Sequence, residues 1–314
     1  MKNKNILTVL IFFGLFSCSN NEIQTNVEDL ILKDGKYYSS ENKLFSGAVY
    51  RLYENGNTKN KGTLLNGLGE GKYEQFYENG DKKIVGNMRA GAWFGEYRSY
   101  HPGEILDTET VFNEKGQNGP FKEYNAKGII QRSGSHKNNQ FEGLIKLYDD
   151  NGQIKSQANY VNGEVFGELT IFNIDGIKES TSTYKYGKRN GQTTIFWSNG
   201  NRRVETYFED DKRNGIQRTY FENGRLDMEV TYVNEIAKGP YKEYYESGNL
   251  REEGVFTNTE KNGYYTRYYD MSNSEANAVL DAAASALGES NTTRYTKGMP
   301  QQTGIYKDGK DIKD

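Results

Sequence analysis

Residues 215–226 read GIQRTYFENGRL: a glycine, a short run with aromatic residues, an Asn-Gly pair and a second short run. The arrangement returns at residues 239–250, which read GPYKEYYESGNL. Asn-Gly between two runs of strand-forming residues is a strong signal for a β-hairpin, because a type I′ turn needs positive φ at both central residues. The stretches therefore predict two hairpins of one kind, 24 residues apart.

The leading glycine of this motif recurs every 24 residues along most of the chain. The ten glycines are Gly47, Gly71, Gly95, Gly119, Gly143, Gly167, Gly191, Gly215, Gly239 and Gly263. We number them as position zero of repeats one to ten. Position five is aromatic in nine repeats, and position nine is a second glycine in eight. This period predicts an all-β fold, an elongated twisted antiparallel β-meander of tandem hairpins.

The spacing also predicts contacts within each hairpin. A two-residue loop at positions eight and nine pairs residues whose positions sum to seventeen, so position zero faces seventeen and position two faces fifteen. Position fifteen is small in most repeats, which lets a ring at position two lie over it. Long charged residues at positions three and twelve, such as Lys122 and Lys146 at three and Lys83 and Arg203 at twelve, are expected to cover the position-five rings with their aliphatic stems.

The two ends of the repeat array differ from its middle. Residues 30–38 predict a preceding hairpin. In repeat ten, Ser272 replaces the turn glycine and forms a capping box with Glu275, which predicts a helix over residues 273–287 that covers the sheet edge. Residues 293–314 are interpreted as a remnant hairpin, and residues 29–314 as a single repeat domain.

The N-terminus has the features of a targeting segment. Lys2 and Lys4 precede an apolar run from Ile6 to Phe16 that is too short to span a bilayer, so residues 1–17 predict a signal peptide. The lone cysteine, Cys18, follows it. This arrangement resembles a bacterial lipoprotein signal, which implies cleavage before Cys18, its lipidation and anchoring at the cell envelope, with a plain secreted protein as the alternative. Ser19 points, by the same resemblance, to the outer membrane of a Gram-negative bacterium. Residues 18–28 are expected to form a flexible tether.

Composition excludes several classes of function. Hydrophobic residues make up 34% of the chain, and 40 Lys and Arg balance 43 Asp and Glu, so the basic excess of a nucleic-acid binder is missing. One Cys and two His exclude a disulfide framework and a Cys/His metal cluster. The sequence carries no recognisable constellation of catalytic residues, so we expect a protein without enzymatic activity, metal or cofactor.

The repeated Gly, aromatic strand and Glu-Asn-Gly of residues 215–226 resemble the variant MORN repeat. That family includes proteins of the antitoxin or immunity type, which implies a scaffold that binds another macromolecule, a protein and in one form a toxin. The alternatives are a structural envelope lipoprotein and a module associated with cell-wall glycan or lipid. We expect a monomer whose partner contacts the aromatic residues of the central repeats, namely Tyr124, Tyr148, Phe172, Phe196, Trp197 and Tyr220.

Overall fold

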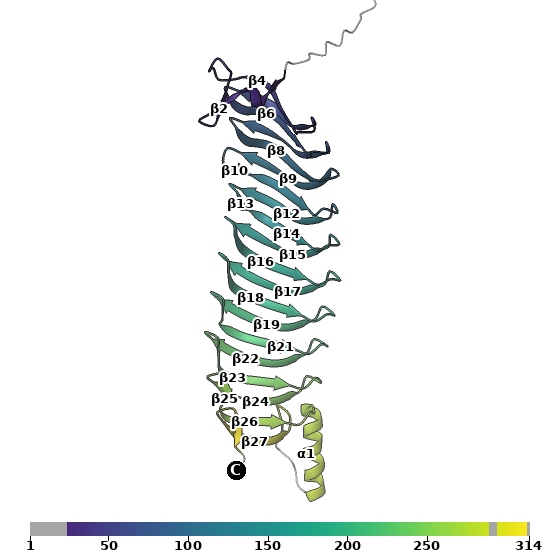
Figure 1. Cartoon of the computed structure of the whole chain (residues 1–314). Coiled ribbons are helices and arrows are strands. Elements are labelled where there is room, and N and C mark those ends of the chain that lie inside the picture. Colours follow the sequence, from purple (N-terminus) through teal and green to yellow (C-terminus); the bar gives the residue numbers. More distant parts are fainter. Residues whose placement is uncertain (1–23, 289–293, 313–314) are drawn as a thin grey trace, which may run out of the picture. The chain divides into compact units, whose positions relative to one another are not determined.

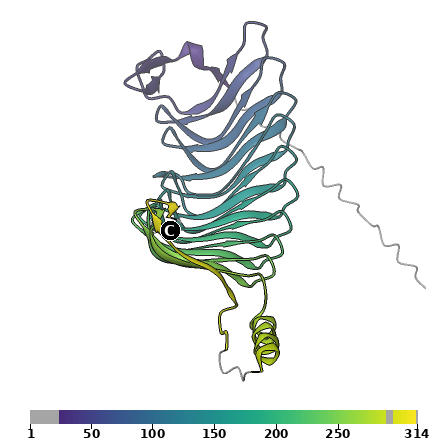
Figure 2. The ribbon, with the colours of Figure 1, turned by 90° about the horizontal axis from the view of Figure 1, so that it is seen from below.

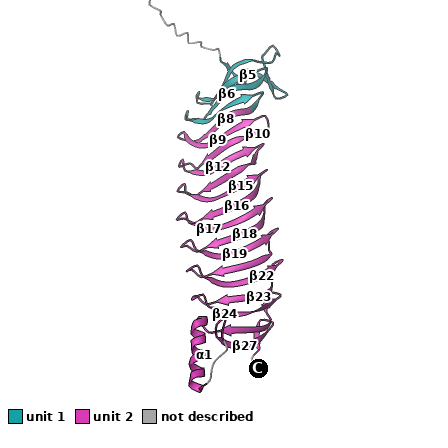
Figure 3. Ribbon diagram, turned by 180° about the vertical axis from the view of Figure 1, so that it is seen from behind, with its two compact units in different colours: residues 1–92 teal, residues 93–314 magenta. Residues whose placement is uncertain are grey.

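The computed structural model describes residues 24–288 and 294–312. Contacts divide the chain into two compact units, Met1–Ala92 and Trp93–Asp314 (Figure 3). The predicted signal peptide at residues 1–17 and Cys18 lie outside the described residues. None of the described helices is long and apolar enough to cross a membrane. A single domain over residues 29–314 stays a prediction.

The first unit packs its N-terminal segment against the first repeats. Its elements are β1 (Thr25–Asn26), the 3-10 helix η1 (Val27–Asp29), β2 (Ile31–Lys33), β3 (Lys36–Tyr38), β4 (Gly47–Leu52), β5 (Thr58–Leu65), β6 (Leu68–Phe76) and β7 (Lys82–Arg89). Strands β2 and β3 form the hairpin expected over residues 30–38. Strand β1 pairs in parallel with β4, and Val27 is buried against Val49 and Leu64. Residues 25–28, which we assigned to the tether, are therefore structured because an apolar side chain anchors them.

The second unit is an antiparallel meander in which each hairpin pairs with the next (Figure 1). Its strands are β8 (Ala92–His101), β9 (Ile105–Asn113), β10 (Gly116–Gln117), β11 (Gly119–Tyr124), β12 (Ile130–Lys137), β13 (Gln140–Phe141), β14 (Gly143–Tyr148), β15 (Ile154–Val161), β16 (Glu164–Phe172), β17 (Lys178–Lys185), β18 (Lys188–Phe196), β19 (Arg202–Glu209), β20 (Lys212–Arg213), β21 (Gly215–Tyr220), β22 (Leu226–Val233), β23 (Ile236–Tyr244), β24 (Leu250–Thr257), β25 (Glu260–Lys261), β26 (Gly263–Tyr268), β27 (Pro300–Lys307) and β28 (Lys310–Ile312). The expected all-β hairpin meander is confirmed.

The predicted register is correct from position zero to position four and shifts at position five. Gly215 pairs with Tyr232 and Gln217 with Val230, as the sum of seventeen requires, but Tyr220 pairs with Leu226 through a β-bulge. The type I′ prediction for the Asn-Gly pair is wrong. The amide of Gly224 donates to the carbonyl of Phe221, and only the glycine has positive φ, so the loop is a three-residue turn closed by a left-handed glycine.

Glycines at positions zero and fifteen serve two different purposes. At position fifteen the expected contact is confirmed, because a Cβ on Gly254 would lie 2.8 Å from Cε1 of Tyr241. At position zero all ten glycines have positive φ, and in six of them an added Cβ would meet no atom within 4 Å. Gly239 has φ of +99°, and a Cβ at this residue would meet no atom within 4 Å, so the recurring glycine answers a backbone requirement.

Repeat ten is complete, which corrects the expected place of the helix. The helix α1 (Asn273–Leu287) has the expected capping box at Ser272 and ends at Gly288. However, β27 pairs with β26 in the register of every other hairpin, Gly263 with Tyr306 and Tyr265 with Gly304. The hairpin expected near the C-terminus does form, since β27 also pairs with β28, Ile305 with Ile312, and its first strand doubles as the second strand of repeat ten. Helix α1 belongs to an insertion of 26 residues in the turn of this hairpin rather than to a cover over the sheet edge.

Candidate binding site at the first turns

The turns that follow position five, here called the first turns, lie in a row along one edge of unit two (Figure 2). Residues at position six link successive repeats along this edge. The Trp197 Nε1–H donates to the carbonyl of Tyr220 at 3.0 Å, and the Tyr245 hydroxyl donates to that of Tyr268 at 2.9 Å. In the first unit, Tyr53 donates to the Phe76 carbonyl at 2.8 Å. Each donor thereby reaches the position-five carbonyl of the next repeat.

Cations at position twelve lie over these position-six rings. The guanidinium of Arg203 is 4.9 Å from the Trp197 ring centroid, and Nζ of Lys83 is 5.3 Å from that of Tyr77. The expectation that position twelve covers the position-five ring is therefore wrong. The bulge in the second strand shifts the register there, and it brings the cation to the neighbouring ring.

Three consecutive repeats lack an aromatic residue at position six. Asn125, Asp149 and Asn173 occupy it in repeats four, five and six. Their Oδ1 atoms are used inside their own turns, as in Asp149, which accepts from the amides of Asn151 and Gln153 at 2.9 and 2.8 Å. The row of rings is interrupted where these short side chains fold back on the backbone.

A depression of about 570 Å³ opens beside this interruption. The residues that line it are Gln131, Tyr148, Asp149, Asp150, Ile154, Lys155, Phe172, Asn173, Ile174 and Glu179. Two rings and two aliphatic side chains supply its apolar surface, and Ile174 is 74% exposed. A concave site with an apolar lining and a few polar groups can hold a side chain of a partner.

The charges around the depression are mixed. Asp149, Asp150 and Glu179 contribute carboxylates and Lys155 an ammonium group. Within the described ranges, Lys155 has no ion pair and stacks on no ring. The Tyr148 hydroxyl lies 3.0 Å from Oγ of Ser133, which holds this ring in place. The lining is thus partly ordered, with one cation free to meet a ligand.

The six aromatic residues predicted to bind a partner do not form one site. Tyr148 and Phe172 lie together in the depression. Tyr124 and Tyr220 direct their hydroxyls to Glu109 and Glu205 of the preceding repeats, and Trp197 spans the repeat boundary. Burial and the Glu205 carboxylate raise the pKa of Tyr220 to about 12. Phe196 is half-buried at the end of β18.

Sequence reasoning missed Asp149, Lys155 and Ile174. The signal for them was present in the aligned repeats, where position six changes from aromatic to Asx in three successive units. A search for residues that recur misses this site, because the site is distinguished by the absence of the usual aromatic residue at position six.

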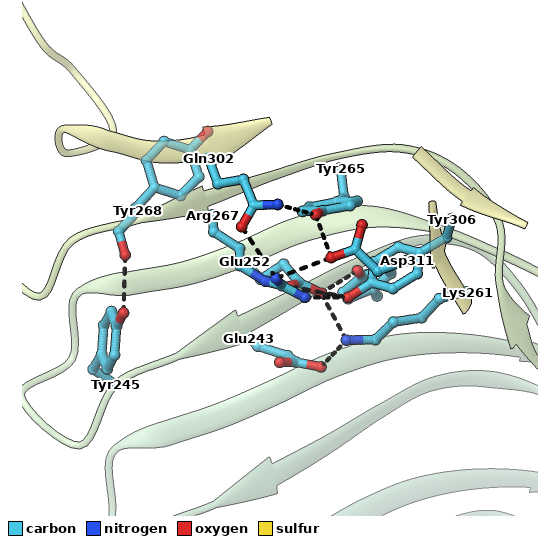
Figure 4. A network of polar contacts seen from close by, with 11 residues as sticks. Glu243, Tyr245, Glu252, Lys261, Tyr265, Arg267, Tyr268, Gln302, Tyr306 and Asp311 are labelled. Atoms are coloured by element: carbon cyan, nitrogen blue, oxygen red, sulfur yellow. Dashed lines mark hydrogen bonds and ion pairs between the residues drawn. The ribbon is translucent and has the colours of Figure 1, made fainter. Parts of the chain in front are cut away.

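In two other polar regions of unit two, the charged groups already form ion pairs within the protein. A depression of about 640 Å³ contains Lys122, whose Nζ lies 3.2 Å from Oε1 of Glu109. Near the C-terminus, the buried Glu252 meets Lys261 at 2.7 Å and Arg267 at 2.5 Å (Figure 4). No group of three or more His, Cys, Asp or Glu in residues 24–288 and 294–312 could hold a metal ion.

Comparisons with known proteins identify the repeat. No curated protein matches the chain. Similar solved structures include a crystal structure of TcdB2-TccC3-Cdc42, at 10% identity and a TM-score of 0.15 over 73% of this chain and 17% of that one. Another is TcdB2-TccC3 without its hypervariable C-terminal region, at 12% identity and a TM-score of 0.18 over 74% of this chain and 15% of that one. The chain therefore spans less than a fifth of these structures. Three segments, residues 141–162, 213–234 and 238–258, match the family model of the MORN repeat variant.

Proposed function

We propose that this protein is a scaffold of MORN-like repeats that binds a partner protein, without catalysis, through the depression at the first turns of repeats four to six. The observation that supports it is the interrupted row of position-six rings beside Tyr148 and Phe172. In repeats one, two, seven and nine the position-six ring and the position-twelve cation lie against one another. In the depression, apolar surface and the Lys155 ammonium remain available, as in an interface centre.

We further propose that Cys18 is lipidated and holds the scaffold at the cell envelope, at the outer membrane of a Gram-negative bacterium. One acyl chain gives only reversible membrane binding, so stable anchoring needs the several chains of a lipoprotein N-terminus. A scaffold held there could capture an incoming toxin, which is the specific form of partner that we propose.

A comparison of variants in a quantitative capture experiment tests this function. The whole protein is used as bait against envelope and secreted fractions, beside the double variant Tyr148→Ala/Phe172→Ala. We expect one stoichiometric protein whose capture falls at least about tenfold in the double variant, because truncated aromatic anchors cost about 1–2 kcal/mol or more each.

A matched control replaces two exposed tyrosines outside the depression, Tyr186 and Tyr264, which are 62% and 80% exposed. The variant Tyr186→Ala/Tyr264→Ala should capture as much as the wild type. Equal capture by both double variants would overturn the proposed site. Recovery of wall or membrane material alone would favour a structural or glycan-associated role.

A further inference from the structure

We propose that the depression accepts an aromatic side chain of the partner that carries a hydrogen-bond donor, a tyrosine or a tryptophan, in the place of the missing position-six ring of repeat five. This inference rests on the proposed function and names the chemistry of the partner.

The chain itself shows how such a side chain is held. At a filled position the donor meets the position-five carbonyl of the next repeat, and the cation at position twelve lies over the ring. Trp197 combines both contacts, at 3.0 Å to the Tyr220 carbonyl and 4.9 Å to Arg203. Tyr245 repeats them with Tyr268 and Arg251. The ring is thus bound by one acceptor and one cation that come from two different strands.

Repeat five has the acceptor and the cation but not the ring. Its position twelve is Lys155, and the next position-five carbonyl belongs to Phe172; both residues line the depression together with Asp149. In the described part of the chain, no side chain donates to the Phe172 carbonyl. The aspartate at position six is too short to reach it and is held by its own turn.

The neighbouring repeats lack this combination. Position twelve is Gln131 in repeat four and Glu179 in repeat six, so neither offers a cation to a ring. Among the three interrupted repeats, the geometry therefore selects repeat five. A depression of about 570 Å³ is large enough for an aromatic side chain and its neighbours along an extended peptide.

The donor on the ring is part of the recognition. Phe221 is the chain's own example of a position-six ring without a donor, and its position twelve is Asp227 rather than a cation. A phenylalanine of the partner could not donate to the Phe172 carbonyl, so tyrosine and tryptophan are favoured over it.

Small probes test the ring chemistry directly. N-acetyltyrosinamide and N-acetylphenylalaninamide are titrated into the whole protein while backbone amide resonances are followed by NMR. We expect the tyrosine probe to bind about three to ten times more tightly and to shift the amides of residues 172–174. Equal affinity of the two probes, or shifts confined to other repeats, would overturn the proposal.

A substitution that supplies the ring from within the chain provides the second test. Asp149→Tyr should place a hydroxyl at the Phe172 carbonyl beneath Lys155, as Tyr245 does in its own repeat. Asn151 can then hold the turn, since its counterpart Asn55 accepts from the Asn57 amide at 2.9 Å. We expect a melting temperature about 2–4 °C higher and at least a tenfold loss of tyrosine-probe binding and partner capture.

Phe221→Tyr is the matched control, because it adds a hydroxyl at position six of repeat eight, whose residues do not line the depression. It should leave probe binding unchanged. If Tyr148→Ala/Phe172→Ala abolishes capture while Asp149→Tyr does not, the inference fails and the proposed function stands. If neither variant affects capture, the proposed function itself fails.

Discussion

Glu252 shows how much one position of the repeat can change. Position thirteen is serine in repeats five and six, but in repeat nine it is a carboxylate with only 3% of its surface exposed. The Tyr241 hydroxyl and Arg267 Nε donate to it at 2.5 Å, and Lys261 Nζ at 2.7 Å. Burial alone would raise the pKa of this carboxyl, but hydrogen bonds from Lys261, Tyr241 and Arg267 outweigh burial and hold it below its usual value. The carboxylate therefore stays ionised between two cations.

At the residue scale, Glu252→Gln should lower the free energy of unfolding by about 1–3 kcal/mol at pH 7, because Lys261 and Arg267 lose the buried carboxylate that they share and keep only Glu243 and Asp311 as ion-pair partners. The lowered pKa stabilises the fold above the unfolded value of 4.5, and this contribution is lost as pH falls through the folded pKa. Urea denaturation between pH 3 and pH 7 should show a steeper acid loss in the wild type than in the variant. Glu260→Gln, on an exposed residue of β25, is the control. Parallel pH profiles for wild type and Glu252→Gln would contradict this account.

At the element scale, the hairpins could be predicted from sequence but their turn types could not. Asn223 keeps negative φ because its Oδ1 accepts from the Arg225 amide, so the first turn is not type I′. The turns that join one repeat to the next, here called the second turns, can carry positive φ at two successive residues without glycine, as in Asp210 and Asp211. There the Asp211 Oδ1 accepts from the Arg189 amide at 2.9 Å. The bond from Arg189 to Asp211 joins a turn to the preceding repeat, so a pattern of residues within the turn does not reveal it.

The candidate site was predictable to the same extent. The period of 24 residues identified Tyr148 and Phe172 as neighbours along one row. The aligned repeats mark Asp149 by the missing ring, but the role of Asp149 and Lys155 follows only from a bond between residues 23 positions apart in other repeats, such as Trp197 to Tyr220. The helix was predictable from its capping box, but its placement inside a hairpin was not. The residues that begin and end a helix do not show that the strand after the helix pairs with the strand before it.

Deletion of residues 272–297 tests the assignment of the helix to an insertion. It restores the 24-residue spacing, with Gly298 as the turn glycine, and leaves the pairing of β26 with β27 in place. We expect the helical circular dichroism signal to vanish and the free energy of unfolding to change by less than about 2 kcal/mol, since a shorter loop offsets the lost contacts. Loss of the cooperative transition would show instead that α1 supports the last repeats.

At the scale of the whole molecule, the chain joins a folded repeat region to a predicted lipid anchor. The first described strand begins at Thr25, seven residues beyond Cys18. Within unit two, the bonds that link repeats join neighbours, as in Trp197 with Tyr220 and Arg189 with Asp211. Stability of that kind is a sum over adjacent interfaces and does not depend on attachment to a surface.

Cys18→Ser should therefore release the protein from membranes without changing its fold. Fractionation of cells should move it from the membrane pellet to the soluble fraction, and its far-UV circular dichroism spectrum should keep the β-sheet signal. Ser19→Ala, a substitution in the same segment that keeps Cys18, is the control and should stay with the membrane. A Cys18→Ser protein that remains in the pellet would contradict lipid anchoring at this residue.

The 26-residue insertion in repeat ten has a consequence for how such a chain can be altered. The strands β26 and β27 pair as those of the other hairpins do, although the loop between them is longer. The turn of a hairpin in this fold therefore tolerates an insertion. A peptide tag, a fluorescent label or an affinity module could be grafted at Gly200 or Gly224 while the strands on either side keep their partners. The same tolerance gives evolution a place to add new parts without redesigning the scaffold.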